Sequence, residues 1–344
     1  MSSALATSDP GEWQLQPPGR AHTWRRGAMS CYAAAFVAQW MYWGFPTDTV
    51  LIFAWLMAAA VCWNIGQPWR CHLQWIRDWG PILGLLLVYD LSRGIAENGR
   101  VPHVTEMITI DKALFDGQLP TVWLQQHFYD PRGVHWWDVF GSFVYMSHFV
   151  VSLGVAIVLW LHRRRLWAAF MRRWFFLAAL GVVTFFLYPA APPWWAAKSG
   201  YIAESVPRIS TRGWGAIGLE GTGRLLNHGQ AMSNPVAAMP SLHSAFAALV
   251  AVFLAGLVAK KWWPLLLAYP LVMTLTLVYS GEHYVTDVLV GWAYVGVSWF
   301  AVSCAERWWR AHRAHVSVAA TPVSPPVSFL PVPPQTAVVS HERV

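Results

Sequence analysis

The sequence carries little charge. Asp, Glu, Lys and Arg together make up 12% of its 344 residues, while 56% of the residues are hydrophobic. Soluble globular domains carry about twice that share of charge, so the composition argues against a soluble domain. Cysteine is also scarce, and the few that occur lie in apolar runs or basic loops: Cys31, Cys62, Cys71 and Cys304. They give neither a disulfide framework nor a thiolate zinc pattern.

The sequence is also short of acidic residues, and its formal net charge is +7. The basic residues gather in short loops between apolar runs, which is typical of the cytoplasmic loops of membrane proteins rather than of a nucleic-acid-binding surface. Tryptophan, in contrast, is abundant with 24 residues, and its indole ring prefers the headgroup layer of a bilayer. The sequence therefore predicts an all-α, polytopic membrane helix bundle that binds no nucleic acid.

Eight apolar stretches approach the length of about 20 residues that a helix needs to cross a bilayer. They are residues 28–45, 47–66, 78–97, 137–161, 174–191, 241–259, 263–282 and 285–305. Only residues 46–48 separate the first two, so the first stretch is alternatively an interfacial helix. We expect about eight spans, with six to eight as the range.

Arginine and lysine clusters orient these spans, because such clusters remain in the cytoplasm. Placing every cluster inside makes both termini cytoplasmic and puts the long segments 98–135 and 192–240 on the outer face. Paired tryptophans at the predicted membrane edges support these boundaries; they begin at Trp136, Trp194, Trp262 and Trp308. The sequence predicts a multi-pass protein of the plasma membrane.

The same reading divides the chain into four parts. Residues 1–24 are predicted to be a disordered cytoplasmic N-terminus, and 25–135 to hold the N-terminal membrane helices and an outer amphipathic segment at 104–128. Residues 136–305 are expected to form the catalytic bundle. Residues 306–344 are predicted to be a basic and then Pro-rich disordered tail.

Two residues at the start of the last apolar stretch have a spacing that suits catalysis. His283 and Asp287 are four residues apart, so on a helix they share one face. A carboxylate beside one ring nitrogen fixes the tautomer, leaves the other nitrogen free and stabilises the imidazolium, as a nucleophile or base requires. The alternative is that the two side chains only pair with each other at the end of a helix and have no catalytic role.

The segment at 240–243 reads Pro-Ser-Leu-His and opens another apolar stretch. Ser241 suits the N-cap position of a helix, where free backbone amides favour an oxyanion such as phosphate. His243 would then be placed to protonate a leaving oxygen, or is only incidental to a capped helix start. The predicted topology puts His243 and His283 on the same outer face.

These segments resemble signature motifs of a known family. Residues 240–243 and 279–287 resemble the second and third motifs of the type 2 phosphatidic acid phosphatase superfamily, and residues 188–195 and 234–243 resemble its inositol phosphorylceramide synthase branch, including bacterial inositol phosphotransferase-like relatives. The resemblance is best over residues 136–305. It implies a metal-independent transfer through a phosphohistidine, with no cofactor, in which His283 attacks phosphorus, Asp287 orients it and His243 protonates the leaving oxygen.

The resemblance also suggests substrate-binding residues within the motifs: Ser241, Gly281, Tyr279, Pro193 and Trp194. However, the superfamily carries an arginine six residues before the nucleophilic histidine, where this chain has Leu277. Arg208 and Arg212 are the preferred replacements to hold phosphate, ahead of Lys198 and Arg224.

Other polar residues near the motifs receive weaker interpretations. Glu282 is interpreted as a solvent-facing charge, with contact to a polyol headgroup as the alternative. No role is assigned to the remaining candidates His103, Glu106, Asp111 and His148.

The sequence therefore predicts a lipid phosphotransferase that moves a phosphoryl or phospho-inositol-type headgroup from a phospholipid donor to an alcohol acceptor at the outer leaflet, in phospholipid or sphingolipid metabolism. A lipid phosphate phosphatase of the same superfamily is the first alternative. A proton-coupled transporter or flippase is the second, although its titratable groups would be expected near the bilayer midplane. A third treats His243, His283 and Asp287 as metal ligands.

Overall fold

The computed structural model describes residues 20–44, 46, 49–96, 101–231 and 234–319. Throughout these ranges the regular elements are helices, with isolated β-bridges between loops. The helices are α1 (Arg20–Trp43), α2 (Thr49–Trp63), α3 (Trp69–Ala96), α4 (Thr105–Leu114), α5 (Pro120–Phe128), α6 (Trp136–His162), α7 (Arg164–Leu187), α8 (Pro193–Lys198), α9 (Gly213–Ala216), α10 (Glu220–Ala231), α11 (Leu242–Ala255), the short 3₁₀ helix η1 (Lys260–Trp262), α12 (Trp263–Tyr279) and α13 (Val285–Ala319).

Each of the eight predicted apolar stretches contains a helix, which confirms a helical membrane protein. Four segments are long and apolar enough to cross a bilayer: Trp136–His162, Arg164–Leu187, Lys260–Tyr279 and Val285–Arg313. Val50–Trp63 and Leu242–Ala255 are apolar but shorter. A helix of 14 residues such as α11 extends only about 21 Å, less than the hydrocarbon thickness of about 30 Å. The count of about eight spans and the cytoplasmic position of the termini stay predictions.

The predicted terminal tails lie largely outside the described residues, at 1–19 and 320–344. Their described parts belong to helices, because α1 begins at Arg20 and α13 continues to Ala319; the disorder of the tails stays a prediction. Residues 306–319 contain neither proline nor glycine, and the next helix-breaking residue is Pro322. The chain divides into two compact units between Val302 and Ser303, and the description below concerns the first.

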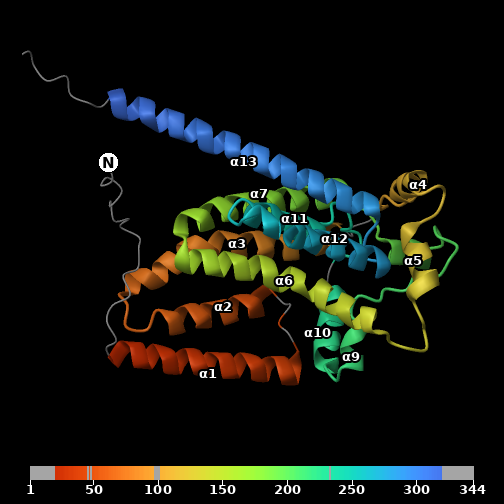
Figure 1. Cartoon of the computed structure of the whole chain (residues 1–344), viewed down its shortest axis with the longest axis horizontal. Coiled ribbons are helices and arrows are strands. Elements are labelled where there is room, and N and C mark those ends of the chain that lie inside the picture. Colours follow the sequence, from red (N-terminus) through yellow and green to blue (C-terminus); the bar gives the residue numbers. More distant parts are fainter. Residues whose placement is uncertain (1–19, 45, 47–48, 97–100, 232–233, 320–344) are drawn as a thin grey trace, which may run out of the picture. The chain divides into compact units, whose positions relative to one another are not determined.

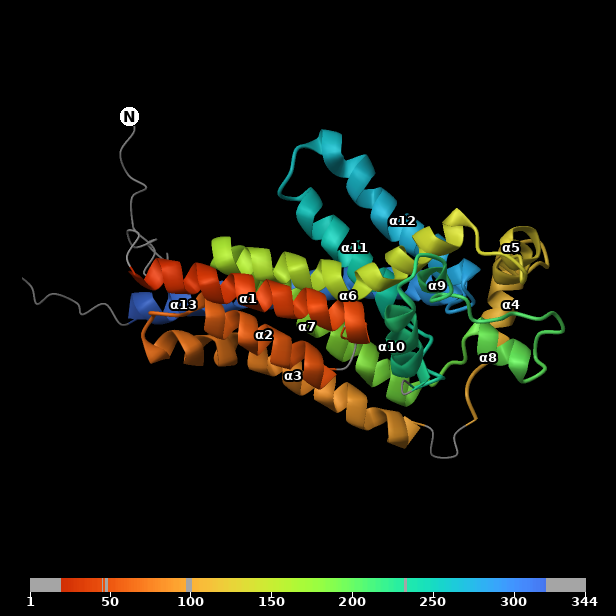
Figure 2. The same ribbon diagram turned by 90° about the horizontal axis from the view of Figure 1, so that it is seen from below.

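Within this first unit, α11 contacts α6, α7 and α12, while α3 contacts α7 and α2, and α2 contacts α1 (Figures 1 and 2). The short helices α4, α5, α8, α9 and α10 gather at one end of the long ones (Figures 1 and 2). The largest core cluster includes the fully buried side chains of Phe170, Leu177 and Leu249. A second apolar cluster lies among the short helices and includes Met107 and Leu119 of the predicted amphipathic segment.

Glycine at position 291 allows α13 to approach the start of α11. A Cβ atom there would lie 2.6 Å from the carbonyl oxygen of Ser241. The backbone N–H of Ser241 in turn donates to the carbonyl oxygen of Asp287 at 3.0 Å. The two segments that carry the candidate histidines are therefore held together at van der Waals distance.

We expect Gly291→Ala to destabilise the protein, because the new methyl group would push against a backbone atom. Overpacking of this kind costs about 1–3 kcal/mol, so the Tm of the detergent-solubilised protein should fall by several degrees in a thermal unfolding scan. Gly296→Ala is the matched control on the same helix, since a Cβ there meets nothing within 4 Å. Equal Tm values for the two variants would contradict this packing.

Candidate active site

A cavity of about 730 Å³ extends from the long helices α2, α3, α6, α7 and α11 to the short helices α8 and α10 and the turn before α13. One part of its wall is polar and includes Arg208, His243, Glu282 and His283. Most of the apolar lining comes from α2, α3, α6 and α7. A cavity of this size accommodates a small organic ligand, and its division into polar and apolar parts suits an amphiphilic molecule.

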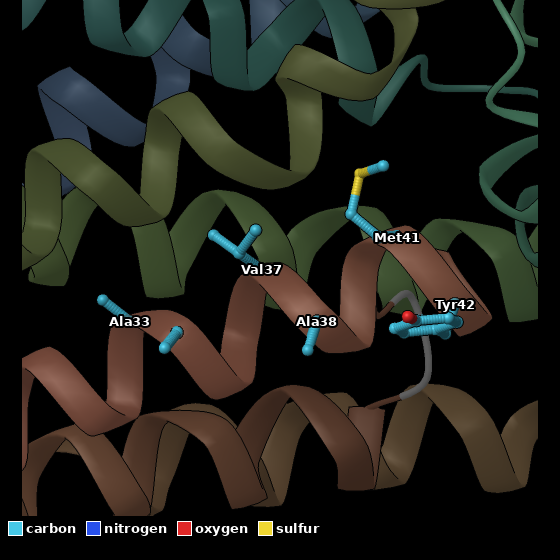
Figure 3. Close-up of a pocket in the computed structure, with 6 residues that line it drawn as sticks. Ala33, Val37, Ala38, Met41 and Tyr42 are labelled. Atoms are coloured by element: carbon cyan, nitrogen blue, oxygen red, sulfur yellow. The ribbon is translucent and has the colours of Figure 1, made fainter.

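A second hollow lies on the surface of α1 and has a different character (Figure 3). Its lining comes from α1 alone, namely Ala33, Ala34, Val37, Ala38, Met41 and Tyr42. This lining contains no histidine and no acidic or basic residue, so the hollow is an apolar helix surface rather than a candidate active site.

The turn between α12 and α13 places His283 and Asp287. Gly281 has a φ of +77°, a conformation that glycine adopts easily, and the chain reverses there. The Nδ1 atom of His283 then lies 3.5 Å from Oδ2 of Asp287, and both side chains are buried. Oδ2 also accepts a hydrogen bond of 2.9 Å from the backbone N–H of Tyr284. The carboxylate thus faces Nδ1, which leaves Nε2 as the nitrogen for chemistry.

His243 lies in the first turn of α11. Ser241 is the N-cap residue, and its Oγ accepts from the backbone N–H of Ser244 at 3.4 Å. The ring centroids of His243 and His283 are 5.6 Å apart, and both residues line the cavity. Nε2 of His243 is buried without a hydrogen-bond partner in the described part of the chain. Buried polar atoms are nearly always paired, so this nitrogen is available for a bound ligand.

The structure thus brings His243, His283 and Asp287 together, as the sequence analysis expects. It also packs a residue to which the sequence analysis assigns no role against them: the ring of His148 on α6 lies 4.1 Å from that of His243, centroid to centroid. Tyr145, one turn earlier on α6, stacks on His243 with the ring centroids 5.1 Å apart. Both residues fall inside a long apolar helix, where spacing alone does not show which face meets the site.

Asp111 on α4 anchors the helix that carries Asp287. Its buried carboxylate accepts hydrogen bonds from the backbone N–H groups of Val285 and Thr286, each at 2.9 Å, and from the hydroxyl of Thr286 at 2.6 Å. Burial raises the pKa of Asp111, against the opposing effect of these hydrogen bonds. Asp111 therefore caps the first turn of α13 from a distant part of the chain.

Glu282 lies next to the nucleophile candidate and is only 6% exposed. Its interpretation as a solvent-facing charge is therefore wrong. Oε1 accepts from Nε of Arg208 at 2.8 Å, and Oε2 accepts from Nη2 of the same guanidinium at 2.8 Å. Burial disfavours the charged guanidinium, but the facing carboxylate overrides this and raises the pKa of Arg208. The guanidinium also lies over the ring of Trp194, 5.1 Å from its centroid.

The structure places Arg212 and Tyr279 in a different network, outside the cavity lining. Nη2 of Arg212 donates to the carbonyl oxygens of Asp130 and Gly133 at 2.8 and 2.6 Å. The hydroxyl of Tyr279 donates to Oδ1 of Asp138 at 2.7 Å. These contacts tie the loop before α6 and the first turn of α6 to neighbouring elements. Binding of phosphate by Arg212 and of substrate by Tyr279 stay predictions. The two further basic candidates, Lys198 and Arg224, are exposed.

The other residues predicted to bind substrate differ in whether they face the cavity. Trp194 lines the cavity, and its indole N–H is buried without a partner among the described residues. Ser241 caps α11, and Gly281 forms the turn and accepts from the backbone N–H of Trp194 at 3.1 Å. Pro193 is buried at the start of α8. Ser241, Gly281 and Pro193 shape the backbone around the site, while Trp194 faces it.

Metal ligation by the two histidines was another possibility that the sequence left open. In the ranges that the structure describes, no group of three or more His, Cys, Asp and Glu side chains is arranged to hold a metal ion.

Comparison with known proteins shows that His243, His283 and Asp287 lie within a segment that matches a protein family. The family model described as the PAP2 superfamily matches residues 111–301. A curated phosphoinositol dihydroceramide synthase from Bacteroides thetaiotaomicron is 28% identical over 193 residues, which cover 51% of this chain and 56% of that protein. The chain thus spans about half the length of this curated relative. No solved structure gives a significant match.

We expect Asp111→Asn to lower both stability and activity, because an amide supplies donors where two backbone N–H groups need acceptors. A buried donor left unpaired costs about 1–3 kcal/mol. Thermal unfolding and turnover of the purified variant test this. Asp116→Asn, at an exposed position in the loop after the same helix, is the control, and identical behaviour of the two variants would argue against the capping role.

Proposed function

Because this chain belongs to the PAP2 superfamily, we propose that it is an integral-membrane phosphotransferase. It moves a phosphoryl or phospho-polyol headgroup from a lipid donor to an alcohol acceptor through a phosphohistidine. The observation that carries this proposal is the pair of histidine rings 5.6 Å apart, with a carboxylate 3.5 Å behind one of them. The synthase named as a relative supports a polyol-phosphate headgroup.

The lining of the cavity supports a lipid donor. Residues such as Phe53, Leu56 and Ile82 extend an apolar surface away from the histidines. An acyl chain on this surface would leave the headgroup phosphorus at the polar end, between His243 and His283. An amphiphilic lipid therefore contacts both the polar and the apolar part of the cavity wall.

The first step breaks the bond between phosphorus and the lipid alcohol oxygen. Nε2 of His283 attacks phosphorus and forms a P–N bond, and the electron pair of the breaking bond goes to the leaving oxygen. His243, in its imidazolium form, gives that oxygen a proton. The growing positive charge on His283 is stabilised by Asp287 across the 3.5 Å contact, which shortens toward a hydrogen bond as the charge develops.

The second step reverses these roles with a new alcohol. Neutral His243 takes the proton of the acceptor hydroxyl, and the acceptor oxygen attacks phosphorus while the P–N bond breaks. His283 and the proton on His243 are then restored, so the cycle consumes no cofactor and uses no metal. If water enters in place of the alcohol, the same steps produce hydrolysis.

We expect His283→Ala to reduce turnover to background, since the nucleophile is lost, and His243→Ala to reduce it about 100-fold or more, the usual contribution of a general acid and base. The assay uses purified protein in nanodiscs with phosphatidylinositol, lipid alcohol acceptors and EDTA, and mass spectrometry of the products. Free inositol phosphate without a transfer product would favour the phosphatase alternative.

A matched control for these variants is His312→Ala, at an exposed position of α13. It should keep wild-type turnover. Unchanged activity of the His283→Ala variant would refute the phosphohistidine, and lower wild-type activity with EDTA than in the same assay without it would favour the metal-ligand alternative.

We further propose that the site opens to the extracytoplasmic face of the cell membrane. Two basic clusters support this, because they lie at the helix ends remote from the histidines. Residues 163–165 are three arginines that join the end of α6 to the start of α7, while Lys260 and Lys261 precede α12, whose other end leads to His283. Basic loops remain cytoplasmic.

Labelling in intact cells tests this orientation. A cysteine introduced at Lys198, which is exposed in α8, should react with a membrane-impermeant maleimide above the background of the native cysteines. A cysteine introduced at Lys261 should react only after lysis. The reverse pattern would place the site on the cytoplasmic face.

A further inference from the structure

The mechanism proposed above gives no role to the buried acid next to the nucleophile. Glu282 is surrounded by donors: besides the two from Arg208, its Oε1 accepts from the hydroxyl of Ser210 at 2.5 Å and from the side-chain amide of Gln230 at 3.2 Å. Gln230 also donates to the Ser210 hydroxyl oxygen at 2.9 Å. A buried carboxylate needs charged or hydrogen-bonding partners to offset its desolvation. Glu282 is therefore part of a buried hydrogen-bonded network and is not a surface charge.

The ion pair determines the charge of the cavity wall. Arg208 is the one arginine or lysine, and Glu282 the one aspartate or glutamate, among the cavity-lining residues of the described chain. Their charges cancel, and the bidentate geometry commits Nε and Nη2 of Arg208 to the carboxylate. The wall around the histidines therefore carries no net formal charge when the imidazoles are neutral.

A second observation also indicates that the cavity wall has little positive charge. Leu277 occupies the position where the resemblance described above would place an arginine, and its side chain is fully buried in an apolar cluster with Met273 and Ala247. Position 277 therefore supplies no cation to the site. A phosphodiester carries one negative charge, whereas a phosphomonoester carries nearly two at neutral pH. The imidazolium of His243, which the proposed first step uses, balances one of these charges, and the second has no counter-charge among the described cavity-lining residues.

We propose that Glu282 is a specificity-determining residue: by neutralising Arg208 it admits a monoanionic phosphodiester donor and disfavours a dianionic phosphomonoester. This inference rests on the proposed function and concerns the same site. It explains why an acidic side chain stays buried beside a histidine that must receive phosphorus. The charge of the pair, rather than the guanidinium alone, selects the donor.

Charge variants test the proposal. Glu282→Gln keeps the shape and one acceptor oxygen but releases the charge of Arg208. We expect it to raise the ratio of kcat/KM for phosphatidic acid to that for phosphatidylinositol at least about tenfold, as expected for one unbalanced charge close to phosphorus in a partly desolvated site. The double variant Glu282→Gln with Arg208→Gln restores neutrality and should return the ratio to near the wild-type value.

The control is Glu220→Gln, which removes the same charge from an exposed ion pair with Arg224 and should leave the ratio unchanged. A wild-type ratio in a folded Glu282→Gln variant would overturn the proposal, since Glu282 would then be only structural. Absence of turnover in the wild-type protein would instead count against the proposed function.

Ligand binding keeps the proposal testable without turnover. Inorganic phosphate at pH 8, which is mostly dianionic, should raise the Tm of the Glu282→Gln variant more than that of the wild type, while dimethyl phosphate, which carries one charge, should show a smaller difference between the two proteins. If the single variant does not fold, the double variant replaces it: unchanged preference between the two anions supports control by net charge, and a lost preference contradicts it.

Discussion

The start of α13 is a helix N-terminus that lies inside the protein, where unpaired backbone N–H groups would be costly. Two carboxylates satisfy this constraint. Asp111 accepts from Val285 and Thr286, and Asp287 accepts from Tyr284. Since His283 directly precedes these residues, the hydrogen bonds that complete the helix end also hold the candidate nucleophile. Asp287 therefore serves the backbone and the imidazole with the same oxygen atom.

The loops between the long helices extend this arrangement to the rest of the site. The backbone N–H of Trp194 donates to Gly281 at 3.1 Å, and that of Ile209 donates to Ser280 at 3.2 Å. The side-chain amide of Gln125 on α5 bridges the carbonyl oxygens of Pro207 and Tyr279 at 3.0 and 2.8 Å. The turn before α13 thus fixes the segments that carry Trp194 and Arg208, and the short helices cover the polar end of the cavity.

The site contains few charged side chains. The wall holds one arginine and one glutamate in direct contact, and the other described lining residues are histidines, uncharged polar residues and apolar residues. In a region of low dielectric constant each uncompensated charge has a large effect. A site of this kind distinguishes ligands by their charge as well as by their shape.

The sequence by itself determined the membrane class, the positions of the long helices and the three candidate catalytic residues. Long apolar stretches must form helices because each helix satisfies its own backbone within the bilayer, and the spacing of His283 and Asp287 is a local property of one turn. Only the tertiary structure decided which other residues belong to the site. Asp111 accepts a hydrogen bond from a helix start that lies 174 positions away along the chain. Glu282 pairs with Arg208, which lies 74 positions away. Arg212, predicted to hold phosphate, donates to the carbonyl oxygen of Gly133 before α6, and Tyr279, predicted to bind substrate, donates to Asp138 in the first turn of α6. The physical reason is that such contacts depend on how distant segments pack, and no local period in the sequence records which side chains that packing brings together.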